Sequence, residues 1–200
     1  MRILGCDISS VSTGWCVLED GVMIAGGVIS PVNGLQQFYG TKTATKKSIN
    51  QIDQAVYIAL QVVAIVLKYR VNGMIIEDCF LKANVRTLQL LARLSGAVLY
   101  AWFGDSDNKK PWIVAANSAR AYLGCKGNAE KHQVMEFIRK KYGLIINQND
   151  IADAFIVAKY YHEKAGVDGD QAVSVFTADN VDKILSVVIE DDAWHYVGDS

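Results

Sequence analysis

The amino-terminal stretch of the chain, residues 1–19, reads MRILGCDISSVSTGWCVLE. Its two apolar runs, 2–7 and 13–19, are typical of β-strands, and the small polar residues between them are typical of a turn. Asp7 ends the first run, which is an unfavourable place for a charge without a partner. This aspartate either forms the turn by bonding the amides that follow it or binds a cation, and these residues alone leave both interpretations open.

Outward from this stretch, the chain continues as strands and helices. A third strand is predicted over 22–30, because the sequence EDG favours a hairpin. A helix is predicted over 48–70, where apolar residues recur at helical spacing: Ile52, Val56, Ala59, Val63 and Val66. The other predicted elements are strands over 73–78 and 111–116, and helices over 84–104, 117–123, 128–142 and 149–164.

The order of these elements predicts an α/β fold. Three meandering strands followed by strands joined through helices indicate a mixed sheet that helices cover. A crevice is expected near the carboxyl ends of the parallel strands. Asn84 and Asn128 are predicted as helix N-caps, and Gly143 as a helix stop.

Length and composition suit one domain with an appendage. The chain has 200 residues, of which 51% are hydrophobic and 20% charged, so a substantial core is expected. We predict a folded domain over 1–165 and an acidic extension over 166–200, which can mimic DNA, contact a partner or aid solubility. The absence of a signal pattern or of a long uninterrupted apolar run predicts an intracellular protein with no membrane partner. Four isolated cysteines argue against a zinc site or a disulfide framework and agree with a reducing compartment.

The formal net charge of −1 hides an uneven distribution. Residues 42–141 contain sixteen Lys and Arg but seven Asp and Glu, whereas residues 179–200 contain six acids and one lysine. A basic segment of this kind is typical of a surface for a polyanion such as nucleic acid. Solvated faces of ordinary helices give the same count, because clustering in sequence need not mean clustering in space.

Four carboxylates occupy the ends of predicted elements. Asp7 and Glu77 end two strands, while Asp150 and Asp153 lie one helical turn apart at the start of a helix. Each has a simpler role, as a turn former, a solvated loop residue or a partner of a helix N-terminus. As a set they would converge on one crevice, where their repulsion requires a cation. Oxygen ligands select Mg²⁺ or Mn²⁺, and two such ions about 4 Å apart are the usual apparatus of phosphodiester hydrolysis.

Four segments carry a resemblance to a known family: 3–15 (ILGCDISSVSTGW), 75–80 (IIEDCF), 127–134 (GNAEKHQV) and 149–162 (NDIADAFIVAKYYH). In this order they are similar to the motifs of the RuvC-type Holliday-junction resolvases, within the RNase H-like superfamily, and particularly of the phage-type members. The resemblance spans about residues 2–163. The family's usual Asp-Pro-Gly turn is replaced here by DIS. This difference is expected to affect the specificity for junctions more than the nuclease chemistry.

The resemblance implies an RNase H-like fold, with a mixed five-stranded sheet of three antiparallel strands followed by parallel strands. It implies a homodimer that cuts four-way DNA junctions with Mg²⁺, two ions per site, or with Mn²⁺ as a substitute. The implied metal ligands and catalytic residues are Asp7, Glu77, Asp150 and Asp153. Lys131 matches the family's lysine beside the scissile phosphate, although a surface lysine of a capped helix is the alternative.

DNA contacts are also implied by the resemblance. Phe80 matches the aromatic residue that stacks on or separates bases at the junction centre, although a Phe after a buried strand is often core. Arg120 matches a second base of the catalytic site, but a phosphate anchor or a helix-surface residue is equally compatible. Further basic residues predicted to contact DNA are Lys42, Lys46, Lys47, Lys82, Arg86 and Lys126.

These observations lead to three hypotheses. The first is a metal-dependent endonuclease that resolves Holliday junctions and other branched DNA. The second is an architectural DNA-binding protein with the same fold and no catalysis. The third is an ATPase related to the actin-like and sugar-kinase proteins, which disagrees with the length of the chain and with the absence of a P-loop or GxGxxG sequence.

Overall fold

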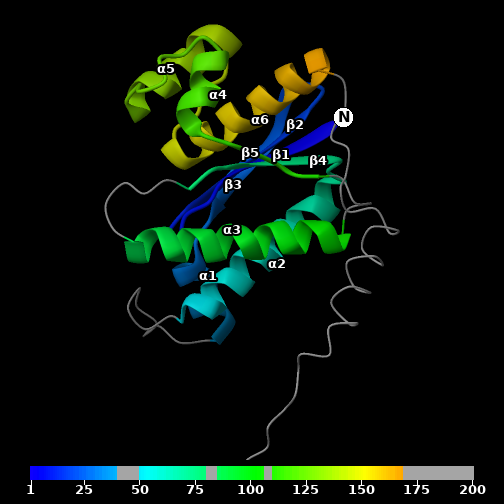
Figure 1. Ribbon diagram of the computed structural model, residues 1–200, viewed down its shortest axis with the longest axis vertical. Coiled ribbons are helices and arrows are strands. Elements are labelled where there is room, and N and C mark those ends of the chain that lie inside the picture. The colour runs from blue at the N-terminus through cyan, green and yellow to red at the C-terminus, as the bar shows by residue number, and fades with distance from the viewer. Residues whose placement is uncertain (40–49, 80–84, 106–109, 169–200) are drawn as a thin grey trace, which may run out of the picture.

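The computed structural model describes residues 1–39, 50–79, 85–105 and 110–168 (Figure 1). A five-stranded sheet lies at its centre, in the order β3-β2-β1-β4-β5. The strands are β1 (Arg2–Asp7), β2 (Thr13–Glu19), β3 (Val22–Ile29), β4 (Gly73–Glu77) and β5 (Trp112–Val114). β1, β2 and β3 pair antiparallel, and β4 and β5 run parallel to β1. The predicted mixed five-stranded sheet is confirmed.

The helices are α1 (Pro31–Tyr39), α2 (Gln51–Tyr69), α3 (Val85–Asp105), α4 (Ala116–Tyr122), α5 (Lys131–Tyr142) and α6 (Asn149–Asp168). α1 is not among the predicted elements, because Asn33 and Gly34 are poor helix formers in a short segment. α6 continues to Asp168, past the predicted boundary at 165, and the rest of the predicted extension, 169–200, lies outside the described residues.

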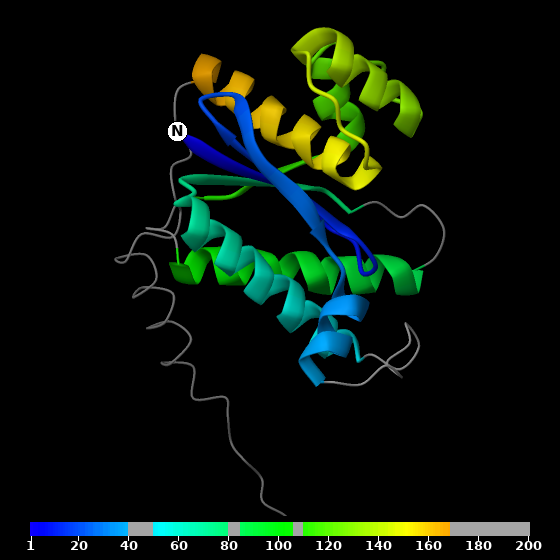
Figure 2. The ribbon, with the colours of Figure 1, turned by 180° about the vertical axis from the view of Figure 1, so that it is seen from behind.

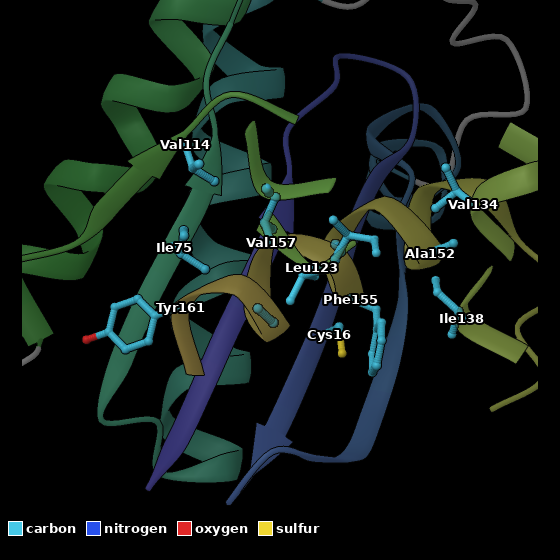
Figure 3. Packing of buried hydrophobic residues seen from close by; sticks show 14 of the residues in the cluster. Cys16, Ile75, Val114, Leu123, Val134, Ile138, Ala152, Phe155, Val157 and Tyr161 are labelled. Atoms are coloured by element: carbon cyan, nitrogen blue, oxygen red, sulfur yellow. The ribbon is translucent and has the colours of Figure 1, made fainter. Parts of the chain in front are cut away.

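Helices cover both faces of the sheet (Figures 1 and 2). On one face, α2 and α3 enclose a core with the sheet, in which Ile58 and Trp102 are buried. On the other face, α6 lies across the strands and α4 and α5 pack against α6. Figure 3 shows this second core, where Phe155 and Val157 of α6 cover Cys16 and Ile75 of the strands. The result is a three-layer α/β/α arrangement.

The face of α2 that is buried is not the face that the helical spacing of its apolar residues predicted. Of the residues at that spacing only Val66 is buried, whereas Ile52 and Val56 are 68% and 51% exposed. Ile58 and Val62 face the core instead. Nearly the whole helix is apolar, so its periodicity does not identify the inward face.

By length and composition alone, α2 could also cross a membrane, the one helix among the described residues of which this is true. The prediction that no apolar stretch is long enough is therefore wrong for residues 51–69. In this fold the helix packs against α3 and the sheet through Ile58, Val62, Ile65 and Val66.

Two glycines set the position of α6 on the sheet. A Cβ atom at Gly5 of β1 would overlap the carbonyl oxygen of Ala154, and one at Gly14 of β2 would overlap that of Asp150. Both strands thus allow the helix backbone to approach closely, which larger residues would prevent. The first turn of α6 is held in this way at the end of β1.

Candidate active site

The four carboxylates singled out by the sequence meet at one edge of the sheet. Asp7 is the last residue of β1 and Glu77 is the last residue of β4. These strands are parallel neighbours in register, so their carboxyl ends lie side by side. Asp150 lies in the first turn of α6 and Asp153 lies three residues further on, and this helix packs across β1.

Asp7 is the electrostatic centre of this group. Burial of its side chain raises its pKa, and the nearby charges of Glu77, Asp153 and Asp150 raise it further, to about 7. Lys131 opposes this shift. Glu77, Asp150, Asp153 and Lys131 therefore all lie within electrostatic reach of Asp7.

Asp153 is held by Arg120 of α4. One guanidinium nitrogen lies 2.7 Å from Oδ1 of Asp153, and the two side chains are only 13% and 8% exposed. A charge-assisted bond of this kind is strong and directional. Arg120 is therefore largely enclosed beside Asp153, which argues against its interpretation as a helix-surface residue.

Asp150 is bonded through both of its carboxylate oxygens. The hydroxyl of Ser12 donates to Oδ2, and Nζ of Lys131 lies 3.5 Å from Oδ1. Lys131 is the first residue of α5, whose N-cap is Glu130 in a capping box with Gln133. The predicted cap at Asn128 is wrong by two positions, while Gly143 does end the helix, in the left-handed conformation (φ 67°).

The turn after Asp7 is closed by hydroxyl groups. Thr13 is fully buried; its Oγ1 donates to the carbonyl of Ser9 at 2.7 Å and accepts from the Ser9 amide at 3.1 Å. The Ser9 hydroxyl accepts from the amide of Val11 at 3.3 Å. The small polar residues after Asp7 thus close this turn with their own hydroxyl groups.

Two of the other predicted DNA contacts belong to the described residues. Arg86, in the first turn of α3, and Lys126, ahead of α5, are both exposed to solvent. The remaining predicted contacts fall outside the described residues: Lys42, Lys46, Lys47, Phe80 and Lys82. Sequence reasoning missed Ser12, although the hydroxyl-rich turn was a signal that a side chain there would bond a neighbouring element.

The donor set fits a hard divalent cation. The four carboxylates offer only oxygen atoms, and the charges of Arg120 and Lys131 balance only part of theirs. Within the described ranges, no three His, Cys, Asp or Glu side chains are arranged to hold one ion. Asp153 pairs with Arg120 and Asp150 pairs with Lys131, so a cation must compete with these two charged partners.

This fold, with carboxylates at adjacent strand ends and on the helix that crosses them, defines an RNase H-like nuclease. The sequence model of the family described as crossover junction endodeoxyribonuclease RuvC matches residues 3–161. The chain belongs to the RuvC family, and it is thereby a Holliday-junction-resolving nuclease. Nucleases of this family depend on a divalent metal ion.

Solved structures agree with this fold. The Thermus thermophilus RuvC structure is similar at a TM-score of 0.66 and 19% identity, covering 84% of this chain and 97% of that one. T. thermophilus RuvC in complex with Holliday junction substrate matches at 0.66 and 17%, covering 85% and 97%. The yeast mitochondrial Holliday junction resolvase Ydc2 matches at 0.52 and 12%, covering 80% and 77%. No curated protein sequence matches the chain.

Proposed function

We propose that the chain resolves four-way DNA junctions with Asp7, Glu77, Asp150 and Asp153 as ligands of Mg²⁺, two ions per site, for which Mn²⁺ can substitute. The observation that carries this proposal is the position of Asp7 and Glu77 at the ends of adjacent parallel strands, with Asp150 and Asp153 within electrostatic reach of Asp7, in a chain of the RuvC family. Binding of branched DNA is supported by the likeness to RuvC in complex with its junction substrate. Such a nuclease acts on DNA inside the cell.

The protein groups have distinct tasks in this proposal. A divalent ion bound by the carboxylates supplies an activated water and stabilises the leaving oxygen. Lys131, which is 57% exposed at the mouth of the site, is placed to pair with a phosphate as negative charge builds on it. Arg120 fixes Asp153 and contributes positive charge in a buried position, where such charge acts over a short range with little screening.

Dimerisation is a second part of the proposal, because paired cuts across a junction need two sites. The outer surface of α2 carries four exposed apolar residues: Ile52, Val56, Leu60 and Leu67. On the adjacent α3, Tyr100 is 83% exposed. Exposed apolar side chains that recur along one helix in this way are typical of a contact with another protein, and we infer a second copy of this chain.

The deciding experiment is cleavage of labelled four-way, three-way, flap and linear DNA, with Mg²⁺ and with EDTA. We expect Mg²⁺-dependent cuts in the four-way junction. The Asp153→Asn variant should still bind the junction but cut it at least about 100-fold more slowly. Loss of a group that only hydrogen-bonds a metal ligand costs less than this. Cleavage by Asp153→Asn at the wild-type rate would contradict the assignment of the site.

The same experiment separates the alternatives. An architectural DNA-binding protein would bind the junction without cutting it, with or without Mg²⁺. Salt dependence of binding does not distinguish the two, because both neutralise phosphates. Calorimetric binding of ATP would instead favour the ATPase hypothesis.

A further inference from the structure

Ser12 lies in the turn between β1 and β2, and 138 residues separate it in sequence from Asp150, to which its hydroxyl donates. Its bond goes to Oδ2 of Asp150, while Lys131 approaches Oδ1 of the same carboxylate. Both oxygens of Asp150 therefore have a partner, and the two partners come from different elements. The carboxylate is constrained from both sides.

The support beneath Ser12 is well fixed. The next residue, Thr13, is completely buried and bonds both the amide and the carbonyl of Ser9. Gly14 then packs directly under the backbone carbonyl of Asp150. The turn thus contacts both the backbone and the side chain of Asp150, and the position of the serine hydroxyl relative to α6 has little freedom.

The two partners of Asp150 differ in chemistry. Lys131 is a flexible cation, mostly exposed, which DNA phosphate can attract away. The serine hydroxyl is neutral, so it orients the carboxylate without cancelling its charge, and each carboxylate oxygen has a further lone pair for a ligand. A neutral donor that fixes a ligating carboxylate increases the affinity for metal by reducing the freedom that is lost on binding.

We propose that Ser12 is a positioning residue, which orients Asp150 for the divalent cation. This inference rests on the proposed function, since it presumes that Asp150 is a metal ligand. It assigns the hydroxyl-rich sequence after Asp7 a task beyond closing the turn. The bond from Ser12 links the turn that follows Asp7 to the carboxylate of Asp150 on α6.

The test is metal binding by the full-length chain without DNA, measured by titration calorimetry with Mn²⁺. Ser12→Ala is expected to raise the Kd about 10-fold. Ser10→Ala is the matched control, because it removes a hydroxyl from the same turn and is expected to stay within about 2-fold. Ser12→Cys keeps the size of the side chain with only a weak donor, and it should also raise the Kd.

Junction cleavage gives the second measurement. In Ser12→Ala the Mg²⁺ concentration for half-maximal rate should rise about 10-fold, while the rate at saturating Mg²⁺ should change much less. A merely structural role would lower the melting temperature and leave the metal dependence unchanged, which would overturn the inference. If Ser12→Ala and Ser12→Cys both bind Mn²⁺ with the wild-type Kd, the role of Ser12 is overturned and the proposed function stays intact. A wild-type chain that binds no divalent cation would overturn both.

Discussion

Asp7 makes the stability of the folded chain depend on pH at the candidate site. Its pKa is about 7 in the folded chain, above the ordinary value of 3.8, because of burial and then of Glu77, Asp153 and Asp150. Between about pH 4 and pH 7 the folded state therefore holds more protons than the unfolded state. The free energy of unfolding must fall as pH rises through this window, and the full penalty is present above pH 7.

An Asp7→Asn variant should lose this penalty. At pH 8 in EDTA we expect its melting temperature to exceed that of wild type by roughly 10 °C. A carboxyl whose pKa is raised from 3.8 to about 7 costs about 4 kcal/mol, and each kcal/mol is worth about 2–4 °C in a chain of this size. The difference should shrink toward pH 5, where wild-type Asp7 is protonated, and Mg²⁺ should raise the melting temperature of wild type only. Calorimetric scans measure both effects, with the exposed acid Asp78→Asn as control. An equal pH dependence in both proteins would contradict the assigned environment of Asp7.

Individual residues of the site differ in how far the sequence revealed them. Asp7 and Glu77 could be found because a strand end is readable from an apolar run, and the helical spacing of Asp150 and Asp153 is explicit. The burial of Arg120 against Asp153 could not be found in this way. It depends on how closely α4 packs on α6. Arg120 and Asp153 are 33 positions apart, so no local sequence pattern shows that they meet.

At the scale of elements, α6 on the sheet is the arrangement that builds the site. Gly5→Ala should force the helix away from β1, because the added Cβ would meet the carbonyl of Ala154 and lie 2.7 Å from the Cβ of Ala158. We expect a loss of about 1–3 kcal/mol in the free energy of unfolding, as for other overpacked cores. Urea titration measures it.

The matched control for this substitution is Gly96→Ala in α3, where an added Cβ has nothing within 4 Å. Alanine favours a helix over glycine by about 1 kcal/mol, so this variant should be unchanged or more stable. A Gly5→Ala protein as stable as wild type would show that α6 does not need the close approach.

The strands were predicted more accurately than the helices, for a physical reason. β1 and β2 begin and end as predicted, because turn residues mark their ends. In the turn after β2, Asp20 and Gly21 have φ values of 49° and 81°, as an Asp-Gly hairpin requires. The buried face of α2 and the cap of α5 were wrong. An all-apolar helix offers several faces, and only the packing of α3 and the sheet selects one.

At the scale of the whole molecule, the two helical layers have separate roles. α6, with α4 and α5, carries Asp150, Asp153, Arg120 and Lys131 toward the sheet edge. The layer of α2 and α3 lies on the opposite face of the sheet (Figure 2). It exposes apolar side chains to solvent. Separation of this kind would allow two copies to associate through α2 and α3 while both active sites remain open to DNA.

Leu60→Glu tests this arrangement, because Leu60 is 61% exposed on α2 and a buried charge there would disfavour association. We expect wild type to be a dimer and the variant a monomer by light scattering after gel filtration, with the Mg²⁺ affinity unchanged. On a supercoiled plasmid with one cruciform, wild type should give mainly linear product from paired cuts. The monomer should give mainly nicked circles, because each encounter delivers one active site.

Val22→Glu is the control, since Val22 is 67% exposed but lies on the sheet edge at the end away from Asp7. It should remain dimeric and produce linear plasmid as wild type does. A Leu60→Glu protein that stays dimeric would move the interface away from α2. A wild-type monomer that nevertheless makes paired cuts would show that the two sites meet only on the DNA.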